Sequence, residues 1–178
     1  MPGSSDLGKD FTKNWFDTKD FKTILDVGPG WGTYSKLLRK DNTIWDCVEI
    51  HEAYVNRFNL NSLYNNIFIY SISDFKYKHF YDVVIFGDVL EHMSKELVHK
   101  SLDRAKQNSK YMIISIPLDE ESHAEKGTGA FDWDNIYEEH VSMWTFDSFS
   151  DFLKELNIEI ESFERHSNIA IFICKGNL

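Results

Sequence analysis

The sequence predicts an α/β fold: a doubly wound sheet of seven strands, mostly parallel, that ends in a C-terminal antiparallel hairpin. Short, continuously apolar runs alternate along the chain with stretches whose apolar residues repeat at helical spacing. This alternation is typical of parallel strands that carry helices on both faces. The last two apolar runs are separated by only a few turn residues, which favours an antiparallel pair.

Length, composition and charge indicate one folded domain. The 178 residues fit a single hydrophobic core, and 42% hydrophobic and 15% aromatic residues can fill it. The net charge of −10 disfavours nucleic acid and anionic lipid as partners. No apolar run approaches the roughly 18 residues of a membrane span, and the first residues lack a signal-peptide core. We therefore expect a cytoplasmic protein, with residues 1–20 as a partly flexible N-terminal segment and residues 21–178 as the single domain.

The first strand and the first helix of that domain follow each other directly. Residues 23–28 form a short apolar run that ends in glycine. After Gly32, the apolar residues Tyr34, Leu37 and Leu38 repeat at helical spacing. These residues predict one strand, turn and helix unit.

The same unit recurs through the middle of the chain. Val98, Leu102 and Ala105 share one face of the next long helix. Pro117 closes the strand after it, because proline cannot donate a hydrogen bond to the ladder. The predicted elements are strands at 43–50, 67–72, 81–87 and 111–116 and helices at 52–60 and 95–107.

The last third of the chain departs from this pattern. Residues 118–144 show no periodicity. A loop of this length inside a compact domain is usually functional, so we expect a substrate loop there. Thr145 suits the N-cap of a helix whose apolar residues share one face. The final strands are predicted at 158–164 and 169–174.

The two cysteines, Cys47 and Cys174, each lie in an apolar stretch without a nearby cysteine in sequence. Buried free thiols are the favoured interpretation, and a disulfide between them is the alternative. No Cys or His pair has the spacing of a zinc site, and no set of carboxylates has the spacing of a cation site. The sequence therefore predicts no metal.

The strongest motif follows the first strand, where the residues from Asp26 to Gly32 read Asp-Val-Gly-Pro-Gly-Trp-Gly. Glycines there allow the backbone to approach a ligand closely, and the following helix offers unpaired N–H groups. At the end of the second strand, Glu49 can accept hydrogen bonds from both hydroxyls of a ribose. Together these features predict a nucleotide-like ligand, and a tight turn without a ligand is the alternative.

The spacing of the glycines distinguishes two classes of ligand. Dinucleotide sites prefer Gly-x-Gly-x-x-Gly, whereas this turn reads Gly-x-Gly-x-Gly and follows Asp26. A carboxylate at that position disfavours a phosphate, but it can receive an ammonium group directly or through water. S-Adenosylmethionine, with an adenosine at one end and an amino acid at the other, carries the matching groups. An NAD-dependent oxidoreductase is the alternative that the glycine spacing and Asp26 disfavour.

With these motifs the chain resembles the class I S-adenosylmethionine-dependent methyltransferases. The resemblance is carried by residues 24–32, 48–50, 73–75 and 81–92. It implies a Rossmann-like sheet of seven strands, with the last two antiparallel, and a single methyltransferase domain over residues 21–178. Residues 137–145 further resemble the branch of the family that acts on small molecules.

The resemblance implies a role for each part of the site. Asp26 and the glycine turn would border the methionine part of the cofactor, and Glu49 would hold the ribose. Residues 74–75 would flank the adenine, and residues 87–88 would lie beside the transferred methyl group. The cofactor-binding residues that we expect are Asp26, Gly28, Pro29, Gly30, Gly32, Glu49, Ile50, Asp74, Phe75, Gly87 and Asp88.

Three residues are candidates for the proton transfer that some acceptors need: His140, Asp88 and His92. Asp88 and His92 follow the strand end that lies nearest to the reacting centre in an open parallel sheet. Glu91, which follows the same strand end, and His92 can equally cap or orient the following helix, and His140 can equally hold the long loop.

The expected acceptor is a small polar molecule. The chain lacks the Asn-Pro-Pro-Tyr type of element that similar nucleic-acid methylating enzymes carry. O-Methylation of a sugar or a similar metabolite is favoured, because a hydroxyl benefits from a base. The alternatives are N-methylation of a small amine or amino sugar, and a cofactor-binding but catalytically silent partner protein. Specificity is expected from the loop after Pro117, from the segment near Trp15 and Phe16, or from a second subunit in a homodimer.

Overall fold

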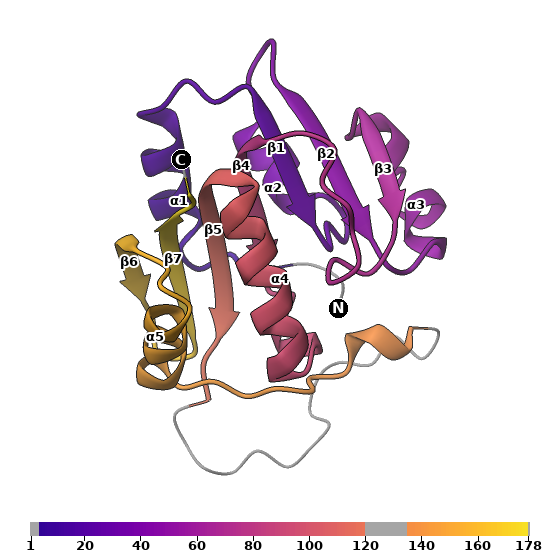
Figure 1. The fold of residues 1–178 in the computed structure, drawn as a ribbon. Helices are drawn as coiled ribbons and strands as arrows, with labels where there is room; N and C mark the ends of the chain where they lie inside the picture. Colours follow the sequence, from indigo (N-terminus) through magenta and orange to yellow (C-terminus); the bar gives the residue numbers. More distant parts are fainter. Residues whose placement is uncertain (1–3, 120–134, 178) are drawn as a thin grey trace.

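The computed structural model describes residues 4–119 and 135–177. Its strands are β1 (Thr23–Val27), β2 (Ile44–Glu49), β3 (Asn66–Ile69), β4 (Tyr81–Gly87), β5 (Ser109–Pro117), β6 (Ile160–Arg165) and β7 (Ile169–Lys175). They form one sheet in the order β3-β2-β1-β4-β5-β7-β6 (Figure 1). Strands β1 to β5 pair in parallel, and β7 runs antiparallel to both β5 and β6. The predicted α/β sheet with a C-terminal antiparallel hairpin is therefore confirmed.

Helices fill most of the connections between the strands. They are α1 (Lys9–Asp17), α2 (Thr33–Leu38), α3 (Ala53–Arg57), α4 (Lys95–Gln107) and α5 (Phe146–Glu155), with 3-10 turns η1 (Leu60–Ser62), η2 (Leu90–His92) and η3 (Ile136–Glu138). Side chains cap two of the helices. Ser94 accepts a hydrogen bond from the backbone of α4, and Thr145 and Ser148 cap each other's N–H groups at the start of α5.

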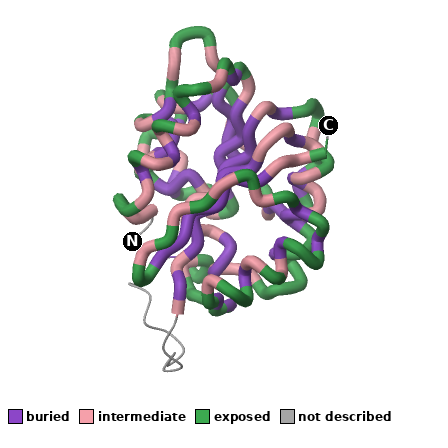
Figure 2. The backbone as a smooth tube through the Cα atoms, turned by 90° about the vertical axis from the view of Figure 1, so that its left-hand side faces the viewer, coloured by how far each residue is buried: buried purple, intermediate pink, exposed green. Residues whose placement is uncertain are grey.

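Two hydrophobic cores lie on opposite faces of the sheet, because successive side chains of a strand point to opposite sides. Leu25 faces the core under α4 and α5, whereas its neighbour Ile24 faces the core under α1 and α2. Figure 1 shows α4 and α5 in front of the sheet, and Figure 2 shows the buried strands running through the middle of the molecule. Burial on both faces explains why these strands are continuously apolar.

The predicted element boundaries agree with the structure to different degrees. Strand β4 and helix α4 match their predicted bounds residue for residue. The helix expected at 52–60 is instead split into α3 and η1, because Asn59 adopts a left-handed backbone with φ 51°. Strand β3 ends at Ile69, three residues earlier than predicted, and the chain then turns out of the sheet.

Helix α1 is an element that the sequence analysis does not predict. Phe16 of this helix is fully buried in the core under α1 and α2, and Trp15 packs edge-on against Tyr111 of β5. Residues 9–17 are therefore part of the packed domain, although residues 1–20 were assigned to a partly flexible segment. Phe11, Trp15 and Phe16 do recur at helical spacing, a signal that the sequence analysis does not use.

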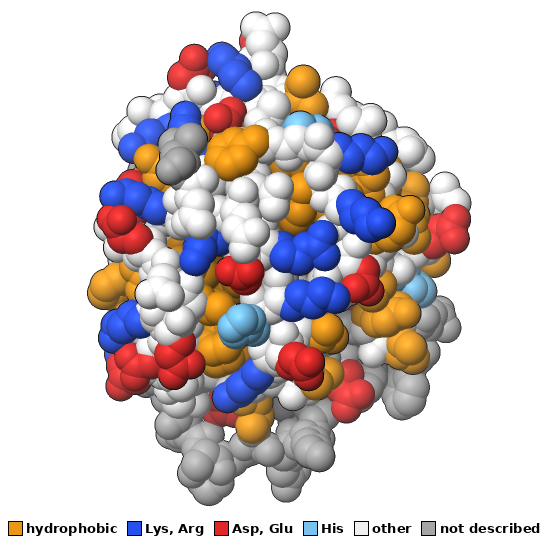
Figure 3. All heavy atoms as spheres, in the orientation of Figure 1, with side chains coloured by type: hydrophobic (Ala, Val, Ile, Leu, Met, Phe, Trp, Pro, Cys, Tyr) orange, Lys and Arg blue, Asp and Glu red, His pale blue; other side chains and the backbone are white. Residues whose placement is uncertain are grey.

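The cysteines and the surface fit the expectations from composition. Cys47 and Cys174 are both buried and free, so the interpretation as unpaired thiols is confirmed. Basic and acidic side chains are interspersed over the face shown in Figure 3. Within the described ranges, no helix combines the length and the apolar composition that crossing a membrane requires.

Candidate active site

A cavity of about 420 Å³ lies at the carboxyl ends of β1, β2 and β4. Its volume is in the range of sites for small molecules. Strand β2, which follows β1 in the chain, lies on one side of β1 in the sheet, and β4 lies on its other side. In open α/β sheets, ligands bind at such a reversal of strand order. Figure 1 shows η3 and the chain after it crossing this end of the sheet.

The glycine turn after β1 forms one wall of the cavity through Gly28, Pro29 and Gly30. Gly28 has φ 60°, and its N–H donates to the carbonyl of Val48 at 2.8 Å. A Cβ atom on Gly28 would lie 2.6 Å from a methyl carbon of Val89. Only glycine fits this position, so the turn presents bare backbone to a ligand.

Asp26 lies at the floor of the cavity and is 1% exposed. Tyr64 donates a hydrogen bond of 2.6 Å to its carboxylate. Burial raises the pKa of Asp26 to about 7, and this effect outweighs the opposing effects of Tyr64 and Lys9. A cationic group of a ligand would stabilise the ionised carboxylate.

Glu49 stands at the end of β2, on the same cavity, and is 4% exposed. Its Oε1 accepts a hydrogen bond of 2.7 Å from the backbone N–H of His51. Burial is also the main reason that the pKa of Glu49 rises to about 7. The backbone N–H groups of residues 50 and 51 both interact with this carboxylate. Its two oxygens offer about four acceptor positions, so it can accept further hydrogen bonds from ligand hydroxyls.

Asp88 follows β4 in a left-handed backbone with φ 55°, which is uncommon for a residue with a side chain. Its carboxylate accepts a hydrogen bond from the hydroxyl of Ser115 on β5. A second hydrogen bond of 2.7 Å comes from the backbone N–H of Ser5. The N-terminal segment is thus bound directly to the residue expected beside the methyl group.

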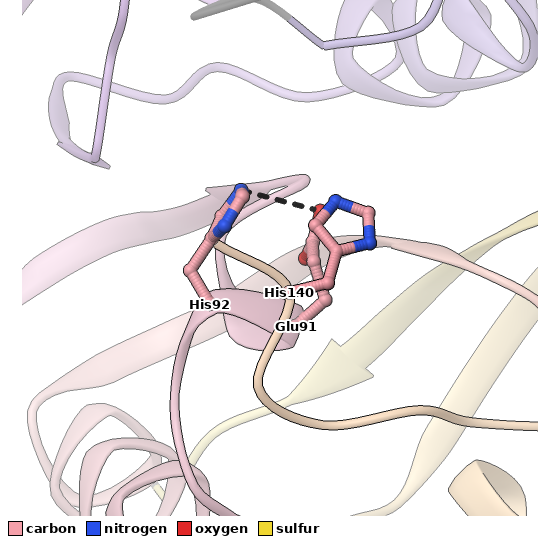
Figure 4. Close-up of side chains that lie close together, drawn as sticks. All are labelled: Glu91, His92 and His140. Carbon is pink, nitrogen blue, oxygen red and sulfur yellow. Dashed lines mark ion pairs between the residues drawn. The ribbon is translucent and has the colours of Figure 1, made fainter. Parts of the chain in front are cut away.

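Glu91, His92 and His140 meet at the cavity, and we call them the histidine–glutamate cluster (Figure 4). One possible ligand atom from each lies within 4.8 Å of the others. Nε2 of His92 is 3.8 Å from Oε1 of Glu91. The backbone N–H groups of Val141 and Ser142 donate to the carbonyl of Glu91 at 2.7 and 3.0 Å, which brings His140 to this position.

The electrostatics of the cluster favour neutral imidazoles. Burial lowers the pKa of His92 and of His140 below the usual value of histidine. Burial also raises the pKa of Glu91 well above its usual value, and Asp88 and Glu138 add to this rise. The carboxylate of Glu91 therefore lies in an environment that opposes its charge.

The comparisons with known proteins agree with this site. A family model described as a methyltransferase domain matches residues 4–162. The chain belongs to this family. It is a class I methyltransferase that uses S-adenosylmethionine. This assignment sets aside the NAD-dependent oxidoreductase. No curated protein matches the methyltransferase.

Solved structures of low sequence identity share the fold of the methyltransferase. An S-adenosylmethionine-dependent methyltransferase from Clostridium acetobutylicum has 13% identity and a TM-score of 0.72, covering 96% of this chain and 90% of its own. A Burkholderia thailandensis 1,6-didemethyltoxoflavin-N1-methyltransferase has 11% identity and a TM-score of 0.73, covering 97% and 78%. The N-terminal domain of EvdMO1, crystallised with S-adenosylhomocysteine and D-fucose, has 14% identity and a TM-score of 0.68, covering 97% and 83%.

Most of the sequence-predicted site residues of the methyltransferase come together at the cavity. They are Asp26, Gly28, Pro29, Gly30, Glu49, Ile50, Gly87, Asp88, His92 and His140. Gly32 is outside the described lining and instead begins α2 with φ 79°. A Cβ atom there would lie 2.4 Å from Leu63, so Gly32 serves the turn rather than the cavity.

The structure does not bring Asp74 and Phe75 to the described cavity lining. Asp74 forms an ion pair of 2.9 Å with Lys100 on α4, and Phe75 is buried in the core under α4 and α5. Residues 70–72 line the cavity in their place. Strand β3 ends three residues earlier than predicted, so the residues that follow it and face the cavity also come earlier in the sequence.

The part of the N-terminal segment that reaches the cavity also differs from the segment near Trp15 and Phe16 that we expected. Trp15 and Phe16 pack against the sheet, whereas Ser4 and Ser5 reach the cavity. Glu91 is a further cavity residue for which the sequence left structure and catalysis equally open. Of the expected substrate loop, residues 120–134 lie outside the described part, and Tyr137 and Glu138 line the cavity.

Proposed function

We propose that the methyltransferase methylates a hydroxyl group of a small polar acceptor, such as a sugar or a similar metabolite. The observation that carries this proposal is the histidine–glutamate cluster on the cavity beside Asp88. An amine needs no strong base to accept a methyl group, but a hydroxyl has a pKa far above neutrality. A cavity that presents two neutral imidazoles and a carboxylate therefore suits a hydroxyl acceptor.

The cavity residues fit the parts of the cofactor. Asp26 can pair with the ammonium group of the methionine part, because its buried carboxylate gains from a cation. Glu49 can accept hydrogen bonds from the ribose hydroxyls, and residues 70–72 border the space next to it. When bound, S-adenosylmethionine supplies an electrophilic methyl group on its sulfonium.

The remaining residues of the cavity orient the acceptor. Asp88 is fixed by Ser5 and Ser115, so it can accept a hydrogen bond from the acceptor without a change of its own conformation. It interacts electrostatically with Glu91, His92 and His140. We assign the activation of the acceptor hydroxyl to the histidine–glutamate cluster and the positioning of the acceptor to Asp88.

Related structures support a small acceptor. EvdMO1 was crystallised in the presence of the sugar D-fucose, and a mitomycin 7-O-methyltransferase also shares the fold. The toxoflavin enzyme is an N-methyltransferase with its small substrate bound. Cytoplasmic location and a homodimer stay predictions from the sequence.

The test is a transfer assay with a panel of monosaccharides, other small alcohols, amines and amino sugars, followed by release of S-adenosylhomocysteine. We expect transfer to hydroxyl compounds, and His140→Ala should lower kcat/KM by at least about a hundredfold. His79→Ala is the matched control, because His79 also lies beside a buried carboxylate, Asp46, but outside the cavity lining. Transfer to amines alone, or full activity of His140→Ala, would contradict the proposal.

A further inference from the structure

We propose that Glu91, His92 and His140 bind a divalent transition-metal ion, such as Zn²⁺ or Co²⁺, at the wall of the cavity. Two histidines and one carboxylate are a ligand set that such ions prefer. The metal site stands on its own geometry, and only its role toward the acceptor depends on the proposed function.

The three side chains lie close enough to share one ion. Their ligand atoms are within 4.8 Å of one another, whereas bond lengths to a zinc ion are about 2.0–2.2 Å. Two ligands of one tetrahedral ion lie somewhat more than 3 Å apart, so small rotations of these side chains suffice. Figure 4 shows the carboxylate of Glu91 next to the ring of His140, with His92 facing both.

One oxygen of the buried Glu91 carboxylate has no hydrogen-bond partner among the described residues. The residue is 2% exposed, and its Oε2 has no hydrogen-bond partner in the part of the chain that the structure describes. Burying an ionised carboxylate without a partner is costly, and a bound cation removes that cost. Glu91 lines the cavity, where an ion can enter from solvent.

His92 is already oriented as a ligand. Its Nδ1 lies 3.1 Å from the carbonyl oxygen of Glu139. A carbonyl can only accept a hydrogen bond, so Nδ1 carries the proton and Nε2 keeps a free lone pair toward Glu91. Metal-binding histidines commonly donate their second N–H to a carbonyl in this way.

The surrounding charge also favours a cation. Asp88 and Glu138 lie near enough to the cluster to interact with Glu91, and both are acidic. All three residues line the cavity and His140 is the most exposed of them, so a bound ion would be reachable from the cavity. An acceptor hydroxyl can occupy an open coordination position of that ion, and a metal ion lowers the pKa of a hydroxyl that it binds.

The sequence analysis predicts no metal because the ligands are far apart in sequence. Glu91 and His92 are neighbours at η2, whereas His140 arrives from the far end of the long connection between β5 and α5. Hydrogen bonds between the two segments bring them together: residues 141 and 142 donate to the carbonyl of Glu91, and His92 contacts the carbonyl of Glu139.

The test measures metal binding directly on the full chain. The protein is treated with EDTA, dialysed, and titrated with Zn²⁺ by calorimetry and with Co²⁺ by visible absorption. We expect one tight ion per chain, and binding at least about tenfold weaker in Glu91→Gln and in His140→Ala. His79→Ala should bind as the unaltered protein does, because its imidazole lies 3.7 Å from a carboxylate but has no third ligand among the described residues.

Two further measurements distinguish the loss of the metal site from the loss of the fold. Binding of S-adenosylhomocysteine and circular dichroism show whether each variant is folded. Absence of a tight site in the folded protein, or unchanged Zn²⁺ affinity in both folded cluster variants, overturns the metal site, even if methyl transfer to hydroxyls persists. A tight site that the cluster variants lose, together with transfer to amines alone, supports the metal site and overturns the proposed function.

Discussion

Replacing Asp26 with asparagine should make the protein more stable while it weakens cofactor binding. Asp26 is almost completely buried, and Tyr64 can still donate its hydrogen bond to the amide oxygen of asparagine. The groups that interact with this carboxylate include Lys9, Tyr34 and Tyr64, with Cys47 and Glu49 on the neighbouring strand. Asparagine keeps the shape of the side chain and removes the buried charge.

The size of the effect follows from the pKa of Asp26, which burial raises from 3.8 to about 7. Because the pKa is higher in the folded state, folding favours the protonated form. The stability that this proton contributes is complete below the unfolded pKa and is lost as the pH rises through about 7. At ~1.4 kcal/mol per pH unit, the raised pKa lowers the free energy of unfolding by about 2 kcal/mol at pH 5 and about 4 kcal/mol at pH 8, relative to a pH below the unfolded pKa.

Urea unfolding at pH 5 and pH 8 measures this difference. Asp26→Asn should gain free energy of unfolding at both pH values, and the gain should be about 2 kcal/mol larger at pH 8. S-Adenosylmethionine should bind about tenfold or more weakly to the variant, since an ion pair with the ammonium group is lost. The exposed Asp151→Asn is the control and should change stability by less than about 0.5 kcal/mol. A gain that does not grow with pH would refute the raised pKa and the reasoning from burial.

Three further substitutions test the turn, the core and a helix cap. Gly28→Ala should lower the melting temperature and weaken S-adenosylhomocysteine binding in calorimetry, because its Cβ would collide with Val89 and the left-handed backbone costs about 1–2 kcal/mol. Leu102→Ala should cost about 2–5 kcal/mol in urea unfolding, whereas Leu97→Ala, on the same helix but 39% exposed, should cost clearly less. Thr145→Ala should cost about 1 kcal/mol in the same assay, since the variant loses the cap of α5; an unchanged free energy would show that the cap does not contribute.

The cofactor half of the site was largely predictable from sequence. Asp26, Gly28 and Glu49 stand within a few residues of strand ends, and parallel strands place their carboxyl ends at one edge. Residues 74 and 75 were placed less well, because a strand end is uncertain by a few residues when the apolar run is short. A shift of three residues was enough to exchange the residues that face the cavity.

The acceptor half of the site depends on contacts that sequence patterns do not encode. Ser5 reaches Asp88 across 83 positions, although the first residues have no apolar pattern to mark their place. His140 reaches Glu91 through the backbone of the two residues after it. Each of these contacts is polar, so hydrophobic periodicity carries no information about it.

From β1 onward, the sequence by itself determined the alternation of strands and helices, the two buried faces of the sheet and the cofactor-binding turn. These features depend on local periodicity and on glycine at one left-handed position, and both can be read within a short window. Only the tertiary structure decided which acidic and imidazole groups share the cavity and which carboxylate oxygen has no partner among the described residues. That outcome is set by how the segment after residue 134 and the N-terminus pack against the end of the sheet, because burial and contact, rather than residue type alone, determine the chemistry of each group.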